Sequence, residues 1–285
     1  REYMKILWIS GRRMGKDLAS STEISLCESL QEIGVEVTLI SPGKQFSGSF
    51  KHYPIRDFRI PGITTFSGSV NAIRAAKKLR VSNFDVLLID WRYVYFTRKF
   101  ILNLSIPWCI IDRGPPTFPG PLLRFQKKHW KEAWKIAKMS AERGFVVSEE
   151  HATFVKDYTG VDMSFGVVNS GTNVRKIDHS KSNPNRKLVL AYSGRIDERR
   201  GVEKIPELSR KLSQYGIKHE IIICGEGKFE RELVRLSRNI EEIMFLGRLS
   251  KRDLERTLTQ CHVGIMPMPD IPIWRISSPL KLSEY

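Results

Sequence analysis

Short apolar runs alternate with longer amphipathic stretches along the first half of the chain. The apolar runs, which we expect to form buried strands, lie at residues 4–10, 35–41, 84–90, 106–112, 145–148 and 165–169. The amphipathic stretches, which have the spacing of helices, lie at 20–33, 70–79 and 123–143. Between them, residues 43–62 are rich in turn residues and hold one short extended piece. Apolar strands that alternate with helices are typical of a parallel sheet covered on both faces.

The second half repeats this pattern with glycine at the end of each strand candidate. Its four signals read LVLAYSGRIDERRG from Leu188, EIIICGEG from Glu220, IMFLGRLS from Ile243 and SSPLKLSEY from Ser277. An amphipathic stretch follows each of the first three, which predicts repeated strand–loop–helix units. The polar segment 178–187 contains proline and lacks periodicity, as a linker does. We therefore expect two Rossmann-like α/β domains, at 1–177 and 188–285.

The loop after the strand candidate at 188–193 carries a group of cations. Arg195, Arg199 and Arg200 stand there between Gly194 and Gly201. Open parallel sheets bind ligands at the carboxyl ends of their strands, and guanidinium groups match the geometry of phosphate oxygens. The loop therefore predicts a receptor for a phosphate-bearing ligand.

In this order the motifs resemble those of the GT-B glycosyltransferases of family 4, which run GR…KG, GxG, F.G and sPlKl.EY. The resemblance implies two open sheets facing a cleft and sugar transfer from a UDP- or GDP-linked donor to a glycan or lipid-linked acceptor. It implies retention of configuration and no metal or other cofactor, and the chain has no D-x-D motif. Family members continue beyond the final EY, so we expect a truncated member whose second domain is incomplete.

The resemblance gives roles to residues of the second domain. Arg195 and Arg200, the latter in place of the family's Lys, would stabilise the diphosphate leaving group in the transition state. Glu284 would bind the ribose. The remaining donor-binding candidates of this half are Ser193, Gly194, Gly225, Gly227, Gly247, Arg248, Leu249, Ser278 and Leu280. For the glycines, strand-to-helix turns that need a glycine backbone are an equally good explanation.

One family feature is missing. Many members carry a second Glu eight residues before the one matched by Glu284, close to the transferred sugar, and this chain has Ile276 there. Asp270 and Arg275 are the nearest substitutes.

The first domain carries fewer family signals. Its Gly-rich loop would run from Gly11 to Gly15 beside the donor, and the acceptor would lie near this loop and Arg113. Asp112 and Arg113 follow the strand candidate 106–112, where family members often have His. They are candidates for catalysis, with a satisfied ion pair as the open alternative.

The helix expected at 123–143 combines tryptophan with lysine. Trp130 and Trp134 lie on one stripe, and Lys131 and Lys135 lie on the next. The tryptophan stripe would pack against the sheet, or the helix would contact a membrane or the acceptor, because indole rings and ammonium groups suit a headgroup region.

Composition narrows the class of protein. The chain has 285 residues, 41% of them hydrophobic, and no apolar run long enough to span a bilayer. The first strand starts so early that we expect no signal peptide and a cytoplasmic location, with contact at the inner face of the membrane. The net charge of +16 suits a phosphate-bearing substrate, an anionic membrane or nucleic acid.

The alternative to an enzyme is a non-enzymatic basic module that binds nucleic acid or a membrane. The motifs favour the enzyme, and we expect no nucleic-acid partner. A dinucleotide-dependent oxidoreductase is disfavoured because residues 11–15 lack G-x-G-x-x-G spacing.

Overall fold

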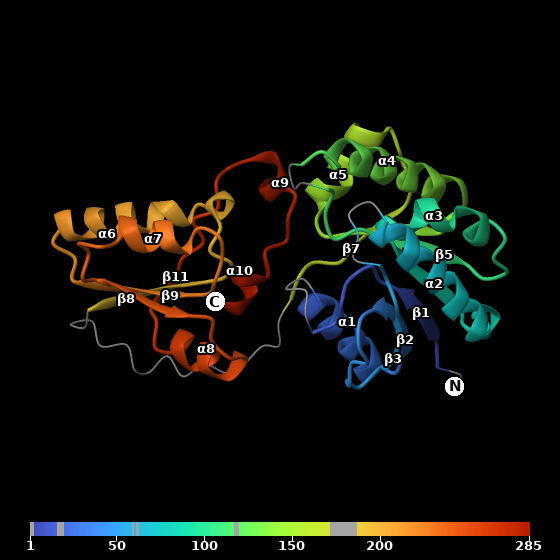
Figure 1. The fold of residues 1–285 in the computed structure, drawn as a ribbon, viewed down its shortest axis with the longest axis horizontal. Coiled ribbons are helices and arrows are strands. Elements are labelled where there is room, and N and C mark those ends of the chain that lie inside the picture. Colours follow the sequence, from blue (N-terminus) through green and yellow to red (C-terminus); the bar gives the residue numbers. More distant parts are fainter. Residues whose placement is uncertain (1–2, 16–19, 59, 61–62, 117–119, 172–186) are drawn as a thin grey trace. The chain divides into compact units, whose positions relative to one another are not determined.

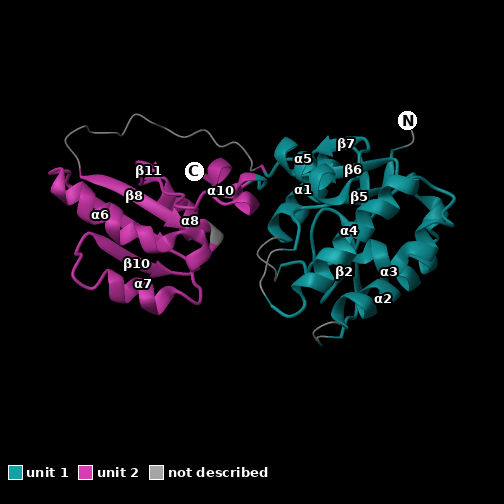
Figure 2. Ribbon diagram, turned by 90° about the horizontal axis from the view of Figure 1, so that it is seen from above, with its two compact units in different colours: residues 1–170, 276–278 teal, residues 171–275, 279–285 magenta. Residues whose placement is uncertain are grey.

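The computed structural model describes residues 3–15, 20–58, 60, 63–116, 120–171 and 187–285. The chain divides into two compact units (Figure 2). Unit 1 comprises residues 1–170 and 276–278, and unit 2 comprises 171–275 and 279–285. Each unit is built on its own parallel sheet, so the predicted α/β class is confirmed. Apart from Lys187, the predicted linker at 178–187 lies outside the described residues, and the domain bounds stay a prediction.

Unit 1 contains a seven-stranded sheet in the order β3-β2-β1-β4-β5-β6-β7, and each neighbouring pair is parallel. The strands are β1 Lys5–Ile9, β2 Glu36–Pro42, β3 Lys51–Ile55, β4 Val86–Asp90, β5 Trp108–Ile111, β6 Arg143–Val146 and β7 Phe165–Val167. From β1 the chain builds outward to β3, then returns to place β4 on the other side of β1. The strands β1 and β4 therefore flank the topological switch point, where open sheets commonly bind ligands.

Helices cover both faces of this sheet (Figure 1). They are α1 Ser20–Glu32, α2 Thr64–Lys78, α3 Trp91–Ile101, α4 Leu123–Ser140 and α5 Glu149–Thr159, with a short 3-10 turn η1 at Val81–Asn83. Successive strand side chains point to opposite faces. In β1, Leu7 and Ile9 join the core that contains α2 to α5, whereas Ile6 and Trp8 join a second core with Cys27 of α1. Both faces of the central strands are buried, which is why β1 and β4 are apolar along most of their length.

The helix α3 was not expected from the sequence. Its residues WRYVYFTRKFI are mostly aromatic or β-branched, a composition that favours strands. The helix forms because Asp90 caps its first turn, with the carboxylate accepting a hydrogen bond of 3.0 Å from the backbone N–H of Arg92. It also buries Tyr93, Val94 and Thr97 on one face. A cap and tertiary burial here outweigh intrinsic propensity.

Unit 2 contains a four-stranded parallel sheet in the order β10-β9-β8-β11. Its strands are β8 Leu188–Ser193, β9 His219–Cys224, β10 Ile243–Gly247 and β11 Val263–Gly264. Its helices are α6 Ile205–Gln214, α7 Glu230–Leu236, α8 Lys251–Leu258, α9 Pro272–Arg275 and α10 Leu280–Glu284, and the 3-10 turns η3 Glu198–Arg200 and η4 Val202–Lys204 follow β8. The core forms between the sheet and its helices around Ile221, Ile223 and Leu233. All strands point the same way, so their carboxyl ends form one edge.

Candidate functional site

The carboxyl edge of the unit 2 sheet brings the three glycine loops of the sequence together. The backbone N–H of Gly194 donates to the carbonyl of Cys224 over 2.9 Å, and that of Gly225 donates to the carbonyl of Gly247 over 2.7 Å. These bonds continue the sheet beyond the last paired residues of β8, β9 and β10. Segments that are more than twenty residues apart in the sequence thus form one continuous loop surface.

Two glycines of this surface are required by backbone contact. A Cβ atom on Gly225, whose φ is +144°, would lie 1.8 Å from the carbonyl oxygen of Gly194. A Cβ atom on Gly227 would lie 1.9 Å from the carbonyl oxygen of Ile196. No side chain fits at such distances. The structural explanation of these glycines therefore holds, and their contact with a ligand stays a prediction.

The hydroxyl of Tyr192 donates a hydrogen bond of 2.7 Å to the backbone carbonyl of Arg195 and holds that carbonyl in place. Burial raises the pKa of Tyr192 to about 12, so the hydroxyl keeps the proton that it donates. The guanidinium of Arg195 is 38% exposed and its Nε lies 3.9 Å from Asp197 Oδ2, a long ion pair. The loop backbone is held by a hydrogen bond, while the side chain of Arg195 is partly exposed.

Arg200 lies at the end of η3 and stacks on a tryptophan that the sequence gave no reason to select. Its guanidinium carbon is 5.5 Å from the ring centroid of Trp274, and the indole N–H of Trp274 donates to the carbonyl of Arg199 over 3.0 Å. A Cβ atom on the next residue, Gly201, would lie 1.9 Å from the carbonyl oxygen of Pro267. The segment that follows β11 thus supports the arginine loop.

The helix α10 lies against the end of β8. The hydroxyl of Tyr285 accepts a hydrogen bond of 2.8 Å from the backbone N–H of Ser193. Lys281 Nζ is 3.5 Å from Ser193 Oγ and donates to Glu284 Oε2 over 2.5 Å, with both charged side chains about a quarter exposed. The predicted residues Ser193, Leu280 and Glu284 therefore lie in the same part of unit 2, and Glu284 forms an ion pair with Lys281.

Two residues just before α10 belong to unit 1 instead. Ser278 Oγ accepts a hydrogen bond of 2.8 Å from the backbone N–H of Ser170. Ile276, which stands where family members have Glu, is buried, and its carbonyl accepts from Ser148 Oγ over 3.0 Å. Donor binding by Ser278 stays a prediction.

Two exposed ion pairs involve residues singled out in the sequence. Asp270 and Arg275 form a two-bonded pair with distances of 2.5 and 2.8 Å. Arg248 Nη1 lies 2.9 Å from Glu226 Oε1, which links the loops after β10 and β9 next to Leu249. Exposed ion pairs of this kind contribute little free energy. Each of these side chains can therefore exchange its partner for a ligand at a small cost in free energy.

In unit 1, Asp112 follows β5 and is completely buried. Its Oδ2 accepts hydrogen bonds from the indole N–H groups of Trp130, at 2.6 Å, and Trp134, at 3.0 Å, and lies 3.6 Å from His151 Nε2. Its Oδ1 accepts from the backbone N–H of Gly114. Burial alone raises the pKa of Asp112, but His151 and the N–H donors outweigh it and bring the pKa below its usual range. The structure corrects the catalytic assignment: a carboxylate sealed in this way positions α4 and α5 and does not reach a substrate.

Arg113 follows Asp112 and is partly exposed. Its guanidinium donates to the carbonyl of Val168 over 2.6 Å and to Ser170 Oγ over 2.8 Å. Burial lowers the pKa of Arg113 to about 10, which leaves the group charged at neutral pH. The side chain ties the end of β5 to the residues after β7, and its role toward a substrate stays a prediction.

A charged cluster at the switch point between β1 and β4 was not predicted. Glu23 of α1 is 2% exposed, accepts from Ser10 Oγ over 2.5 Å and pairs with Arg12 at 3.0 Å. Asp90, which ends β4, pairs with Arg92 at 3.6 Å. Burial raises the pKa of Glu23, and the guanidinium of Arg12 opposes that shift. Asp90 could have indicated this cluster, because it is a carboxylate at the end of an apolar run. Nothing in the sequence indicated that it lies near Glu23.

The predicted loop from Gly11 to Gly15 starts at this cluster. A Cβ atom on Gly11 would lie 3.5 Å from Arg92 Cδ, an ordinary contact. Gly15 has a φ of +70°, and its N–H donates to Ser20 Oγ over 3.2 Å. Gly15 is required by its backbone conformation, and Gly11 is not.

The tryptophans of α4 are core residues. Trp130 is 1% and Trp134 0% exposed, and both donate to Asp112. Buried indoles cannot contact a membrane or an acceptor, which corrects that alternative for these two residues. Lys131 is partly exposed, and Lys135 is exposed and pairs with Glu132 at 2.9 Å; contact through these lysines stays a prediction.

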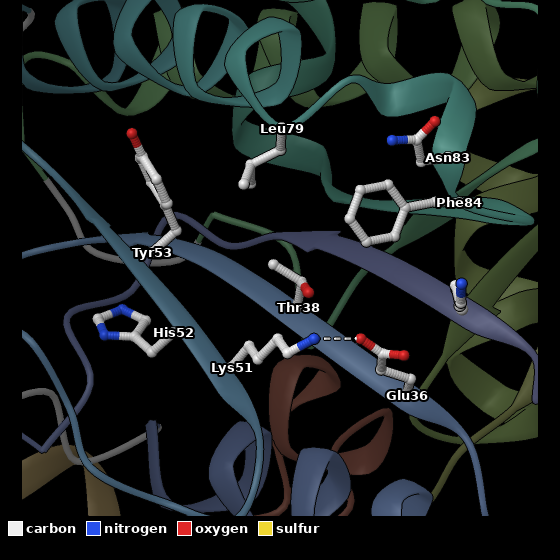
Figure 3. A pocket seen from close by; sticks show the side chains of 9 residues that line it. Glu36, Thr38, Lys51, His52, Tyr53, Leu79, Asn83 and Phe84 are labelled. Atoms are coloured by element: carbon white, nitrogen blue, oxygen red, sulfur yellow. Dashed lines mark hydrogen bonds and ion pairs between the residues drawn. The ribbon is translucent and has the colours of Figure 1, made fainter.

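A pocket of about 340 Å³ opens elsewhere in unit 1, at the amino ends of β1 to β3 (Figure 3). Tyr53, Leu79 and Phe84 form its apolar wall, opposite the ion pair between Lys51 and Glu36. Ligands of open parallel sheets bind at the carboxyl ends. This pocket is therefore separate from both candidate edges.

Among the described residues, no group of three or more His, Cys, Asp or Glu side chains is arranged to hold a metal ion. Within the same ranges, none of the helices combines the length and apolar character of a membrane span.

Residues 173–269 match the model of the family described as Glycosyl transferases group 1. The search of curated proteins found no match. Among solved structures, HepE of Anabaena in complex with UDP-glucose is 15% identical, with a TM-score of 0.60, 92% of this chain covered and 73% of HepE. WaaG, a glycosyltransferase involved in lipopolysaccharide biosynthesis, is 10% identical, with a TM-score of 0.65 and coverage of 94% and 76%.

A third similar structure is S. aureus TarM, in a mutant complex with Fondaparinux, α-GlcNAc-glycerol and UDP. It is 8% identical, with a TM-score of 0.64, 91% of this chain covered and 80% of TarM. At these identities the likeness concerns the fold, which is that of the GT-B glycosyltransferases. The resemblance indicated by the motifs is confirmed for the fold and, over residues 173–269, for the group 1 family.

Proposed function

We propose that the protein is a glycosyltransferase that moves a sugar from a nucleotide diphosphate sugar to a glycan or lipid-linked acceptor. The reaction proceeds with retention of configuration and without a metal ion. The carboxyl edge of the unit 2 sheet binds the donor, and the carboxyl edge of the unit 1 sheet receives the acceptor. Relatives of this fold that were solved with UDP or UDP-glucose support a UDP-linked donor.

The observation that carries this proposal is the assembly around the end of β8. An arginine loop whose backbone is fixed by Tyr192 and Gly201 lies beside a short helix that carries Glu284. As the sugar leaves, charge develops on the bridging oxygen of the diphosphate. Fixed cations stabilise that charge more than they stabilise the bound donor, which accelerates transfer. We assign this role to Arg195 and Arg200.

Glu284 receives the ribose of the donor in this proposal. Its carboxylate is partly exposed and paired with Lys281, which holds it at the loop surface. A ribose hydroxyl that donates to a charged acceptor makes a stronger hydrogen bond than it makes to a neutral one. The pair with Lys281 also places an ammonium group next to Ser193, within reach of a phosphate.

The acceptor side rests on the switch-point cluster of unit 1. Arg12 and Arg92 are held there by Glu23 and Asp90, so their positions are fixed before any ligand arrives. Together with Arg113 they offer guanidinium N–H donors to hydroxyl or phosphate groups of an acceptor. These residues orient the acceptor and do not exchange protons with it.

A thermal-shift panel tests the donor site. We expect UDP and UDP-sugars to raise the melting temperature, because a ligand that binds the folded state alone stabilises it. GDP and ADP with their sugars identify the base preference. Arg195→Ala should remove the shift, since it deletes charge-assisted bonds to the diphosphate that are worth about 1.5–3 kcal/mol.

The matched control is Arg231→Ala, an exposed arginine on α7 of the same unit. It should keep the full nucleotide response. If no nucleotide shifts the wild-type protein, or if Arg195→Ala responds as the control does, the donor site proposed here is wrong. Release of free nucleotide from the sugar donor, measured with candidate acceptors, then separates an enzyme from a binding module.

A further inference from the structure

The pocket at the amino ends of β1 to β3 continues into a second cavity of about 260 Å³. The two cavities meet at Tyr53, which lines both. The second cavity follows the line between β3 and α2 as far as Ile55 and Arg56, at the carboxyl end of β3. We call the two cavities together the β3–α2 groove. It extends along an outer strand of the unit 1 sheet, from one end of that strand to the other.

The lining of the groove is strongly basic. Glu36 is the one carboxylate among the described residues that line it, and it pairs with Lys51. The hydrogen bond from Lys51 lowers the pKa of Glu36, and the charge of Lys5 adds to this shift. The exposed cations of the lining are Lys5, Lys51, Arg56, Arg74 and Lys78. Five cations and one carboxylate leave an excess of four positive charges, which favours an anionic ligand.

Aromatic rings line the same groove. The rings of Tyr53 and Phe84 stand on either side of Thr38, whose side chain lies on the floor that the sheet provides (Figure 3). Lys78 Nζ lies 5.9 Å from the ring centroid of Tyr53, so an ammonium group and an aromatic ring are presented together. The hydroxyl of Thr38 and the amide of Asn83 add uncharged hydrogen-bonding groups.

These three kinds of group match a chain of acidic sugars. A pyranose ring presents a face of C–H groups, which packs on the negative face of an aromatic ring. Its rim carries hydroxyl groups that bond to amide and hydroxyl side chains, and acidic substituents bind ammonium and guanidinium groups. A bilayer is too flat to enter a groove. Pro54 of β3 has no backbone N–H, which disfavours the addition of a peptide strand at this edge.

The groove also leads toward the acceptor side of unit 1. Asp57 follows Arg56 at the carboxyl end of β3, and it pairs with Arg13 of the loop from Gly11 to Gly15 at 2.5 Å. The other end of the groove lies beside Lys5, at the amino end of β1. A glycan whose reacting end lies near that loop can therefore extend along β3 to the opposite edge of the sheet.

We propose that the β3–α2 groove binds the chain of an anionic glycan, away from the sugar that receives the transfer. The choice of a glycan rests on the proposed function, whereas the negative charge and the extended shape rest on the groove itself. Arg74 and Lys78 hold acidic groups, and Tyr53 packs on a sugar face. A second point of attachment raises the affinity for long acceptors, and short acceptors do not benefit from it.

Titration with soluble polymers tests the proposal in the absence of nucleotide. Polygalacturonate and dextran sulfate are anionic glycans, dextran is a neutral one, and polyphosphate has charge without sugar rings. In isothermal titration the wild-type protein should bind an anionic glycan, bind polyphosphate more weakly and leave dextran unbound. Replacing Arg74 and Lys78 together by Gln should weaken glycan binding by about tenfold, which corresponds to about 1.4 kcal/mol.

Tyr53→Leu tests the aromatic part of the groove. It should weaken binding of the anionic glycan by about fivefold and leave polyphosphate binding unchanged, because only the aromatic face is lost. Tyr53→Phe keeps that face and should bind as the wild-type protein does. Lys77 and Lys99, exposed cations of α2 and α3 that line neither cavity, are replaced together by Gln to match the change in net charge. This control should also keep full binding, and circular dichroism confirms the fold of every variant.

Three outcomes contradict the proposal. They are failure of the wild-type protein to bind either anionic glycan, an equal loss in the variant of Lys77 and Lys99, and unchanged glycan binding by Tyr53→Leu, which would mean adsorption of any polyanion. The nucleotide thermal shift should be the same in all variants, because none of these residues belongs to unit 2. A protein that responds to UDP and binds no glycan here keeps its proposed function and loses this site. Glycan binding without any nucleotide response would support the groove and contradict the donor site.

Discussion

The carboxyl edges of the two sheets differ in how they treat charge. In unit 1, Glu23 and Asp112 are almost or completely buried, and short hydrogen bonds or ion pairs hold each of them. In unit 2, Arg195 is 38% exposed and its ion pair with Asp197 spans 3.9 Å, while Arg200 rests its face on Trp274. In unit 1 the charged side chains at this edge pair with one another inside the protein. In unit 2 two arginines on a fixed loop backbone remain accessible to a ligand.

This difference separates residues that support a site from residues that meet a ligand. A buried carboxylate with several donors stabilises the fold and is costly to disturb. An exposed guanidinium on a fixed loop adds little to stability and can bind an incoming anion. We expect substitutions in unit 1 to reduce the free energy of unfolding, and arginine substitutions in unit 2 to change ligand affinity instead.

The largest effect should come from Asp112→Asn. This change removes the charge that two indoles, a backbone N–H and His151 share, and should reduce the free energy of unfolding by about 3 kcal/mol near neutral pH. Because the pKa of Asp112 in the folded protein lies below the value of about 3.9 for an unfolded chain, the stabilisation is present above that value. It is lost as the pH falls through the folded pKa.

Urea denaturation of the wild-type protein and Asp112→Asn at several pH values measures this effect. The gap between the two proteins should narrow in acid. A constant gap over the whole range would show that the lost shape of the site, and not its charge, causes the destabilisation. The imidazole of His151 also faces this carboxylate.

Gly225→Ala tests the backbone contact that joins the loops of unit 2. A Cβ atom 1.8 Å from the carbonyl oxygen of Gly194 forces the two loops apart, so we expect a loss of at least about 2 kcal/mol in the free energy of unfolding. The control is Gly216→Ala, which also has a positive φ but open space around the new atom. It should lose only about 1 kcal/mol. Equal losses in thermal unfolding would mean that φ alone explains the glycine.

Arg12→Ala and Arg200→Ala compare the two edges directly. Removing Arg12 leaves Glu23 buried without its cation, so the free energy of unfolding should fall by about 2 kcal/mol. This loss should shrink in acid, because the raised pKa of Glu23 rises further and the carboxyl takes up a proton.

Removing Arg200 should change stability by no more than about 1 kcal/mol, which is the range of an exposed cation–π contact. Chemical denaturation of both variants decides the comparison. If Arg200→Ala destabilises as much as Arg12→Ala, the arginine loop is a structural element and the contrast between the edges does not hold.

The smallest effect should come from Arg248→Ala. Arg248 and Glu226 are both more than half exposed, and such a pair contributes between zero and about 1 kcal/mol. We expect an unchanged denaturation midpoint. Nucleotide affinity should fall if the loop after β10 contacts the donor, and isothermal titration with UDP measures this separately from stability.

Much of the fold could be predicted because its central strands are buried on both faces. Apolar runs such as 84–90 and 188–193 became β4 and β8 with small changes at their ends. The helix predicted at 70–79 starts earlier in the structure, at Thr64. Its first turns escaped prediction because they carry exposed apolar residues and Ser67 to Ser69, which weaken the helical pattern. The helix α3 was missed because aromatic and β-branched residues have the composition of a strand.

The residues singled out in the sequence lie closer together in unit 2 than in unit 1. Around β8, the residues Ser193, Gly194 and Glu284 do come together, because β8 ends at Ser193 and the short helix α10, which ends at Glu284, lies against that end. In unit 1, Asp112 was assigned to catalysis and the two tryptophans to membrane or acceptor contact, whereas the structure buries all three side chains together. Their hydrogen bonds to one another, and their burial, depend on how α4 packs onto β5.

What the sequence itself determined is local and directional: the alternation of strands and helices, the glycines at the strand ends, and the order of the cationic motifs. These follow from periodicity and backbone preference, which act over a few residues. The tertiary structure alone decided which charges are sealed and which are open, and which side chains line one groove. Burial depends on neighbours distant in the chain, as in the pairing of Ser10 with Glu23 and the approach of Lys78 to the ring of Tyr53.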